Sequence, residues 1–246
     1  MARLLALLAL VAAALAAQPA RAQPLVFDLS SHLIAITTGF SGTELLLFGA
    51  TEGEGDVIVT LRGPETTTVV RKKSRVAGIW INTERMSFTG VPAFYRVAAS
   101  RPIEQIAPPA LRARHQIGLE NLRMTPPVEA RPEDITAFRA GLLRNQETRG
   151  LYASEPARVT FLGPRLFRTR VVLPANVPPG AYTAEVLLVR NGQVLAAQTT
   201  PMFVSKIGLG AEVYDFAHRH AALYGILAIL LAVLSGWGAG VAFRRA

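Results

Sequence analysis

The feature that constrains this chain most is a run of 23 residues, from Ala221 to Phe243, that contains no charged side chain. At about 1.5 Å per residue, a helix of this length spans about 34 Å, which is enough to cross a bilayer core of about 30 Å with a slight tilt. Tyr224 and Trp237 fall toward the two ends of the run, where aromatic residues meet the membrane interfaces. The sequence therefore predicts one transmembrane helix at 221–243.

The first 22 residues have the features of a secretory signal. Arg3 is followed by an apolar stretch, Leu4–Ala17, that is too short to span a bilayer, and small residues precede an expected cleavage after Ala22. Export places residues 23–220 in the periplasm and leaves the tail, 244–246, in the cytoplasm. We therefore expect a single-pass protein of the bacterial inner membrane, and an uncleaved signal gives the same sidedness.

Composition narrows the class of protein further. The chain has no cysteine, which excludes a disulfide-stapled scaffold, a thiolate metal site and a lipid-modified cysteine. It carries 26 bases and 17 acids; four of the bases lie outside residues 23–220, so the predicted ectodomain has an excess of five positive charges. Such a balance suggests nucleic acid as the partner of a cytoplasmic protein, but export removes that partner, and the excess suits a nearby anionic lipid surface.

The first part of the predicted ectodomain, residues 23–101, has the pattern of an immunoglobulin-like β-sandwich. Seven short apolar runs alternate with Gly, Pro and Ser turns at a spacing of about 8–12 residues. The expected strands are Leu25–Leu29, His32–Thr38, Glu44–Ala50, Asp56–Leu61, Thr66–Arg71, Gly78–Asn82 and Ala93–Ala99. The fold class is therefore mainly β.

A Pro-rich segment, residues 102–150, interrupts the β pattern and predicts a helical insertion. One helix is expected at about Ala110–Asn121. A second begins at Pro132, since proline suits the first helical position and two acidic residues follow it. Apolar residues then recur at helical spacing, and Gly150 is a natural stop.

Strands return in residues 151–207, which we expect to form a second small β unit. The expected strands are Arg158–Leu162, Arg165–Leu173, Ala181–Arg190 and Val194–Val204, and Asn191-Gly192 predicts a hairpin between the last two. Four strands are few for an independent sandwich, so this unit either completes itself with Leu151–Ser154 or packs on the first domain. Residues 208–220 are the juxtamembrane link to the span.

The stretch DLSSHLIAITTGFSGTELLLFGA, from Asp28 to Ala50, resembles the opening of an uncharacterised family of alphaproteobacterial transmembrane proteins. The motifs Gly78-Ile79-Trp80-Ile81-Asn82 and Pro92-Ala93-Phe94-Tyr95 are similar to the same family, as is the layout of signal, ectodomain and one C-terminal span. The resemblance implies an envelope protein of unknown function. It also implies a transport accessory role, because sulfite-exporter-like permeases are associated with the family; it supplies no catalytic residues.

Asp28, Ser30 and His32 supply the three group types of nucleophilic catalysis within five residues. Alternation places all three on one face if the strand is unbroken. The competing interpretation is a polar turn between two strands, with His32 at a strand end. We favour the turn, because members of a catalytic triad converge in space and closeness in sequence is no evidence for that.

The densest basic run is Arg71-Lys72-Lys73-Ser74-Arg75. It either meets lipid headgroups or an acidic partner, or is a solvated hairpin tip whose charges discourage edge-to-edge pairing. The solvated tip is the preferred interpretation, because short charge runs are usually solvent faces.

Aromatic residues of the predicted sandwich either pack in its core or line a ligand groove. We predict that Trp80 lies in the core, as aromatic residues on the strands of a small sandwich usually do, and leave Tyr95 open between the two. His115 stands between Arg114 and Gln116 and is expected in solvent. The sequence predicts no metal site and no cofactor, because it contains no His-Glu-x-x-His motif and no Gly-rich phosphate loop before a helix.

Small residues recur every four positions in the predicted span, at Ala228, Ala232, Gly236 and Gly240. On a helix this spacing gives one stripe that lets a second helix approach closely. We predict that the stripe packs against a second copy or a membrane-protein partner.

Three functions are open at this point. The leading hypothesis is a non-enzymatic binding or accessory protein at the inner membrane, with a permease as one candidate partner. The second is an envelope hydrolase or sugar-modifying enzyme that uses carboxylates such as Asp28 or Glu44. The third is a structural stalk without a ligand. A pocket with convergent ionisable groups favours the enzyme, and an exposed apolar patch favours the binding protein.

Overall fold

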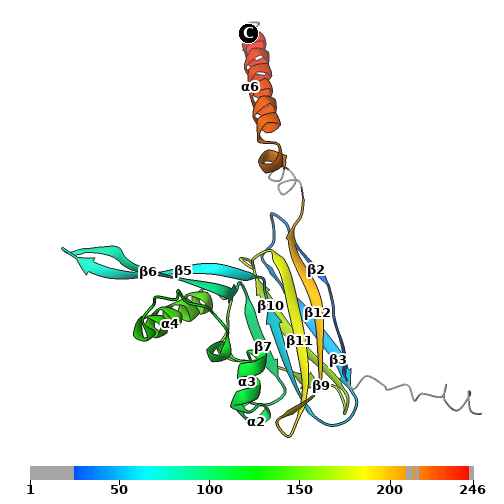
Figure 1. The fold of residues 1–246 in the computed structure, drawn as a ribbon. Coiled ribbons are helices and arrows are strands. Elements are labelled where there is room, and N and C mark those ends of the chain that lie inside the picture. Colours follow the sequence, from blue (N-terminus) through cyan, green and yellow to red (C-terminus); the bar gives the residue numbers. More distant parts are fainter. Residues whose placement is uncertain (1–24, 209–212, 214–215, 244–246) are drawn as a thin grey trace, which may run out of the picture.

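The computed structural model describes residues 25–208, 213 and 216–243, so the signal expected at 1–22 and the tail 244–246 lie outside the described residues. Strands are the largest part of the described chain, and one long apolar helix follows at its C-terminal end (Figure 1). The fold class predicted from the sequence, mainly β with one C-terminal span, is therefore confirmed.

Two sheets form the body of the protein. The first has the strand order β1-β3-β10-β9, in which the strands are β1 (Leu25–Leu29), β3 (Gly42–Thr51), β10 (Leu166–Pro174) and β9 (Thr160–Phe161). The second has the order β2-β12-β11-β4-β7-β8, with β2 (Leu33–Ile36), β12 (Gln193–Lys206), β11 (Gly180–Arg190), β4 (Asp56–Arg62), β7 (Tyr95–Ala99) and β8 (Ala157–Arg158).

The two sheets pack face to face around one apolar core. Buried and exposed side chains alternate strictly along β10, because one face of the strand meets the opposite sheet and the other meets solvent. Leu45 and Leu47 of β3 and Val186 and Leu188 of β11 lie in this core. The body is therefore a β-sandwich.

The order of the strands bears on the immunoglobulin-like prediction. Lettered along the chain, with β1, β3, β4, β9, β10, β11 and β12 as A to G, the first sheet reads A-B-E-D and the second contains G-F-C. Tyr182, near the start of β11, donates a hydrogen bond from its hydroxyl to the Pro178 carbonyl oxygen at 2.7 Å. A tyrosine bonded four residues upstream at this corner is typical of such sandwiches. Both observations favour the immunoglobulin-like arrangement, which stays a prediction.

The segment 151–207 does not form a unit of its own. Strand β10 pairs with β3 along its whole length, and β11 lies between β12 and β4. Both sheets thus combine strands from the two sequence segments, so the second segment completes the first.

Helices occupy the segment between β7 and β8. They are α2 (Ile103–Ile106), α3 (Pro109–His115), the 3-10 helix η1 (Leu119–Asn121) and α4 (Pro132–Thr148). The helix expected at 110–121 ends at His115 instead, because Gln116 takes a left-handed conformation with φ 53°. Helix α4 begins at Pro132 as predicted, and Gly150 follows its end with φ 70°.

A long hairpin projects from the body between β4 and β7. Its strands are β5 (Glu65–Val76) and β6 (Ile79–Pro92), where the sequence predicted two shorter strands. Figure 1 shows the hairpin extending sideways from the sandwich, with α4 alongside its inner part. We call this hairpin the arm, and its last residues, 76–81, the tip.

Helix α6 (Ala221–Phe243) covers the run that the sequence predicts as a span. Residues 221–240 form a helix long and apolar enough to cross a membrane, with none of that stretch buried against the rest of the described chain. No other helix in the described part of the chain meets that test.

Candidate binding surfaces

The root of the arm is part of the core. Phe88 and Val91 of β6 are fully buried, and Val70 and Met86 are nearly so. The backbone N–H of Ala93 donates to the Pro64 carbonyl oxygen at 2.8 Å, which closes the hairpin at its base. The arm is thus fixed to the sandwich at one end.

The tip of the arm has no second layer. A tight turn at Ala77 and Gly78, which both have positive φ, reverses the chain. Ile79 and Trp80 beside the turn are 67% and 66% exposed. The prediction that Trp80 lies in the core is therefore wrong. The physical reason is that Ile79–Ile81 pair only with β5, beyond the reach of the facing sheet and of α4.

The two faces of the tip differ in character, because directly paired residues of two strands point to the same face. Val76 pairs with Ile79 and Ser74 pairs with Ile81, which gives one mainly apolar face. On the opposite face, Arg75 pairs with Trp80 and Lys73 pairs with Asn82. The tip is therefore amphipathic across its thickness.

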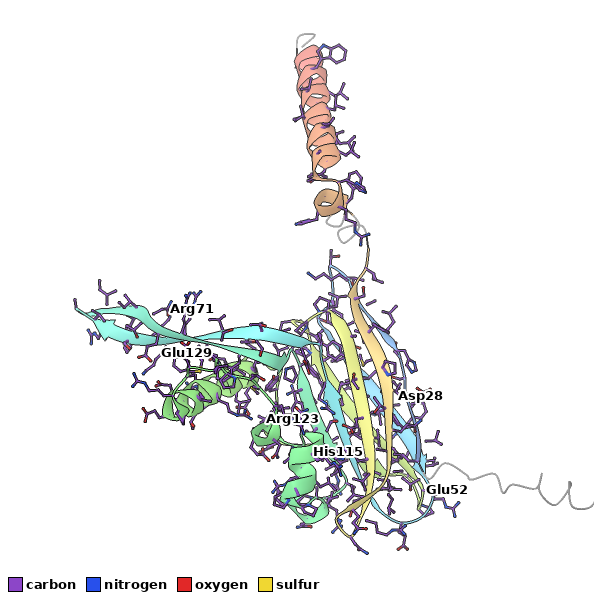
Figure 2. All side chains as sticks on the ribbon, in the orientation of Figure 1. Asp28, Glu52, Arg71, His115, Arg123 and Glu129 are labelled. Carbon is purple, nitrogen blue, oxygen red and sulfur yellow. The ribbon has the colours of Figure 1, made fainter. Side chains whose placement is uncertain are left out.

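The basic run of the sequence lies on the exposed outer part of β5. Figure 2 labels Arg71 there, far from the labelled residues of the sandwich. Arg71 pairs across the hairpin with Arg85, and the Lys72 ammonium forms a half-exposed ion pair with Glu84 at 3.2 Å. Lys73 is also exposed. This placement agrees with a solvated hairpin and leaves the charges free to meet a partner.

Helix α4 supports the inner part of the arm. Phe138 of α4 is buried and lines a small cavity of about 110 Å³ with Val70, Arg71 and Arg144. The Arg139 guanidinium donates to the carbonyl oxygens of Leu119, Glu120 and Leu122, so α4 is also fixed to the 3-10 helix. The arm is therefore held in one direction over its inner half.

A second surface is a groove of about 460 Å³ on the outer face of the first sheet. We call it the sheet groove. Its apolar lining includes Val26, Phe48, Leu162 and Leu166, each about half exposed. Gly49 lets the sheet pack closely beneath the groove, since a Cβ at that position would lie 2.5 Å from the Val26 carbonyl oxygen and 2.6 Å from the buried Phe167 ring.

The sheet groove lies at the end of the sandwich away from the arm. Its lining residue Ala50 is followed by the turn that leads into β4, and the arm leaves the other end of β4. Figure 2 shows Glu52, in that turn, at the opposite end of the body from Arg71. The two surfaces are therefore separate and can serve separate partners.

The Asp28 and His32 side chains do meet, with His32 Nε2 at 3.0 Å from Asp28 Oδ1. Both are more than half exposed. The Ser30 hydroxyl accepts a hydrogen bond from the Leu46 N–H at 3.2 Å, and the backbone N–H of Ser30 donates to the Leu46 carbonyl oxygen. Ser30 therefore fixes the end of β1 to β3, as the turn interpretation expects.

Tyr95 lies fully buried beneath the helical segment. Its hydroxyl donates to the Gln116 carbonyl oxygen at 2.6 Å and accepts from the Gly118 N–H at 2.9 Å. Burial raises the pKa of this hydroxyl well above its usual range. Tyr95 thus holds the loop after α3 against β7 and lines neither surface.

The sequence missed a partly buried charge cluster between α3 and the second sheet. His115 Nδ1 lies 3.1 Å from Glu185 Oε1, and Arg62 donates to Glu185 Oε2 at 2.5 Å. The expectation that His115 is solvated is wrong, because Glu185 reaches it from β11. The sequence does contain one signal for this cluster, Glu185, because an acidic side chain within an apolar strand requires a partner when it is buried.

A more polar groove, of about 530 Å³, follows β7. The Arg101 guanidinium at its rim binds the Asp56 carboxylate through two nitrogens. This bond holds the pKa of Asp56 below its usual range, against the opposing effect of burial. Glu104 and Glu120 lie largely in solvent and share one cation, because the Arg112 guanidinium is within 4 Å of both. Within the described residues, no group of three or more acids and histidines is placed to hold a metal ion.

The stripe of the span is uncovered in the described chain. Ala228, Ala232, Gly236 and Gly240 are all exposed. A Cβ built at Gly236 or Gly240 meets nothing within 4 Å. Any contact through this stripe must therefore come from outside the described residues.

A β-sandwich followed by a single apolar helix of spanning length defines a single-pass membrane protein. The chain matches the family described as "Putative transmembrane protein (Alph_Pro_TM)" over residues 24–245, and it belongs to that family. The resemblance drawn from Asp28–Ala50 and the two shorter motifs is thereby confirmed. No curated protein matches the chain.

Among solved structures, the chain is similar to a family 123 glycoside hydrolase from Clostridium perfringens, studied for glycolipid glycan hydrolysis. The identity is 10%, and the match covers 76% of this chain but only 28% of the hydrolase chain. The TM-score is 0.23, so the likeness carries no argument about the fold or the activity.

Proposed function

We propose that this protein is a non-enzymatic binding protein of the bacterial inner membrane, with its sandwich in the periplasm, that acts as an accessory to a membrane permease. The observation that carries the binding role is the sheet groove. Soluble domains rarely leave several large apolar side chains together at a concave surface unless a partner covers them. We infer that an apolar segment of a partner protein fills the groove.

The geometry disfavours the hydrolase alternative. Asp28 lies opposite Phe48 on β3, and Glu44 lies four residues before Phe48, so the two positions are about 13 Å apart along the sheet. Glycosidase carboxylates are about 5–9.5 Å apart. Both side chains are also more than half exposed on the outer face. A stalk without a ligand, in turn, has no use for an uncovered apolar groove.

The groove is tested by photo-crosslinking from the full-length protein in native membranes. A photoreactive residue at Phe48 samples the groove, and one at Val172 samples the same sheet face outside its lining. Val172 is 54% exposed against 45% for Phe48, so neither replacement disturbs the core. We expect one protein adduct from position 48 and none from position 172. Equal adducts from both, or none from either, would contradict the groove as the binding site.

We propose that the transmembrane helix, α6, makes the contact with the permease. In lipid, helices associate through close backbone contact at small residues, and the uncovered stripe offers that contact. Replacing Gly236 and Gly240 together by Ile should abolish association in a membrane two-hybrid assay. Leu230→Ile, on the same helix, is the matched control and should keep it. Retained association in the double variant would show that the span is a plain anchor.

A further inference from the structure

We propose that the tip of the arm is a contact for an anionic lipid surface, into which Ile79, Trp80 and Ile81 insert while the bases of the arm meet the headgroups. This inference depends on the single span alone and is independent of the groove and of the permease. Three observations support it: the surface chemistry of the tip, its charge, and the place where the arm leaves the body.

The surface chemistry fits the boundary between lipid chains and headgroups. Val76, Ile79, Trp80 and Ile81 are all about half exposed or more, and nothing in the described chain covers them. The backbone groups that pair across the hairpin need no water, and those on its two open edges stay hydrated at the headgroup level, where we place the tip. Tryptophan in particular prefers the headgroup level.

The charge of the arm selects an anionic surface. Residues 71–85 contain five bases and one acid. The acid, Glu84, is paired with Lys72, which leaves an excess of four positive charges close to the apolar tip. Polybasic segments beside apolar anchors bind membranes that contain anionic lipid. A tip that bound only an apolar protein surface would not account for these four excess positive charges.

The arm leaves the sandwich at the end from which the chain continues to the membrane. Arg62, at the end of β4, lies opposite Thr183, and Thr183 lies opposite Pro201 near the end of β12. Figure 1 shows the base of the arm at that end of the body. From Lys206 to Ala221 the chain covers at most about 50 Å, and the 12 residues of β5 extend about 40 Å. The bilayer that holds the span is therefore within reach of the tip, and tethering gives it a high effective concentration.

Tryptophan fluorescence of the full-length protein tests the proposal. The chain has two tryptophans, so Trp237→Phe leaves Trp80 as the sole reporter. The protein is reconstituted in vesicles of brominated phosphatidylcholine, with or without phosphatidylglycerol. We expect Trp80 to lose at least half of its emission when the anionic lipid is present and to recover most of it at high salt. Undiminished Trp80 emission in both compositions would overturn the proposal.

Two triple variants test whether the quenching depends on the positive charges of the arm or on positive charge anywhere on the protein. Replacing Arg71, Lys72 and Lys73 by Gln should remove the quenching. Replacing Arg165, Arg168 and Arg170 by Gln removes the same charge from the exposed face of the body and should leave the quenching unchanged. Melting temperatures close to the parent's show that both variants are folded. Equal loss of quenching in both would overturn the assignment to the arm.

A protein partner for the tip is the competing outcome. A photoreactive residue at Ile79 in native membranes should yield lipid adducts. A single dominant protein adduct from that position would overturn the lipid assignment in favour of a protein contact. Neither result bears on the adducts from position 48, so failure here is distinguishable from failure of the proposed groove.

Discussion

The arm and the sandwich are built from the same kind of strand but treat their apolar residues in opposite ways. Strand β6 belongs to both: Trp80, its second residue, is 66% exposed at the tip, and Phe88 is fully buried at the root. Eight residues along one strand therefore separate an aromatic ring in solvent from one in the core. The difference lies in what packs over the strand, because the facing sheet and α4 cover only the root.

A β pattern of alternating residues shows which side chains share a face of a strand, but not whether that face is buried. Alternation assigns side chains to the two faces of a strand, but a face is buried only where a second layer covers it. In the sandwich that layer is the opposite sheet. On the arm it stops near Val70 and Met86, so apolar residues beyond that point are available to a partner.

The largest effect should come from the root of the arm. Phe88→Ala removes a fully buried ring from the core and should lower the free energy of unfolding by about 3–5 kcal/mol. For a body of this size, that lowers the melting temperature by roughly 6–20 °C in thermal unfolding of the detergent-solubilised protein. Ile81→Ala on the same strand should change it little. Equal losses in both variants would mean that the arm is covered along its whole length.

A glycine in each region gives a sharper comparison. Gly49→Ala places a Cβ 2.5 Å from the Val26 carbonyl oxygen and should cost about 1–3 kcal/mol in unfolding free energy, through overpacking of the body. Gly78→Ala meets nothing within 4 Å, although its φ of 85° strains the turn. We expect chemical denaturation to show the larger loss for Gly49→Ala and a smaller one, from backbone strain alone, for Gly78→Ala. The reverse ranking would contradict the division into body and arm.

The hydroxyl of Tyr95 should have a smaller effect. Tyr95→Phe removes the partner of both the Gln116 carbonyl and the Gly118 N–H, which should cost about 1 kcal/mol of unfolding free energy. Hydrogen exchange should locate the loosening at the Gly118 amide. Unchanged protection at this amide would show that the hydroxyl does not hold the loop.

The smallest of these effects depends on pH. Because Arg101 holds the pKa of Asp56 below its usual range in the folded protein, the ionised carboxylate stabilises the fold above the unfolded pKa of about 3.9. That contribution is lost as the pH falls through the lower, folded pKa. Asp56→Asn should therefore lower the melting temperature slightly at neutral pH, and the difference from the parent should shrink below about pH 4. A difference that is constant with pH would remove Asp56 as its source.

Sequence patterns were most informative where the structure is local. The span at 221–243, the start of α4 at Pro132 and the Asn191-Gly192 turn each depend on residues close together in the chain. The burial of Trp80 and the solvation of His115 depend on distant elements. His115 meets Glu185, 70 residues away, and Trp80 is exposed because no distant element reaches it.

Both sheets combine strands from residues 23–101 and 151–207, and this pairing also depends on residues that are far apart in the chain. The strand pattern of β10 gives its two faces, but nothing in its own residues selects β3 as its neighbour. For the same reason, the sequence alone does not predict the sheet groove or the exposed tip. The sheet groove joins β1, β3 and β10 with Leu162, and the tip requires knowledge of where α4 ends.

The most direct test of the central claim is the melting temperature of Trp80→Ala in the detergent-solubilised, full-length protein. We expect a thermal unfolding curve that superimposes on the parent's, since the Trp80 ring packs against no second layer in the described chain. A melting temperature lowered as far as that of Phe88→Ala would contradict the account, because it would place Trp80 in the core and remove the exposed tip.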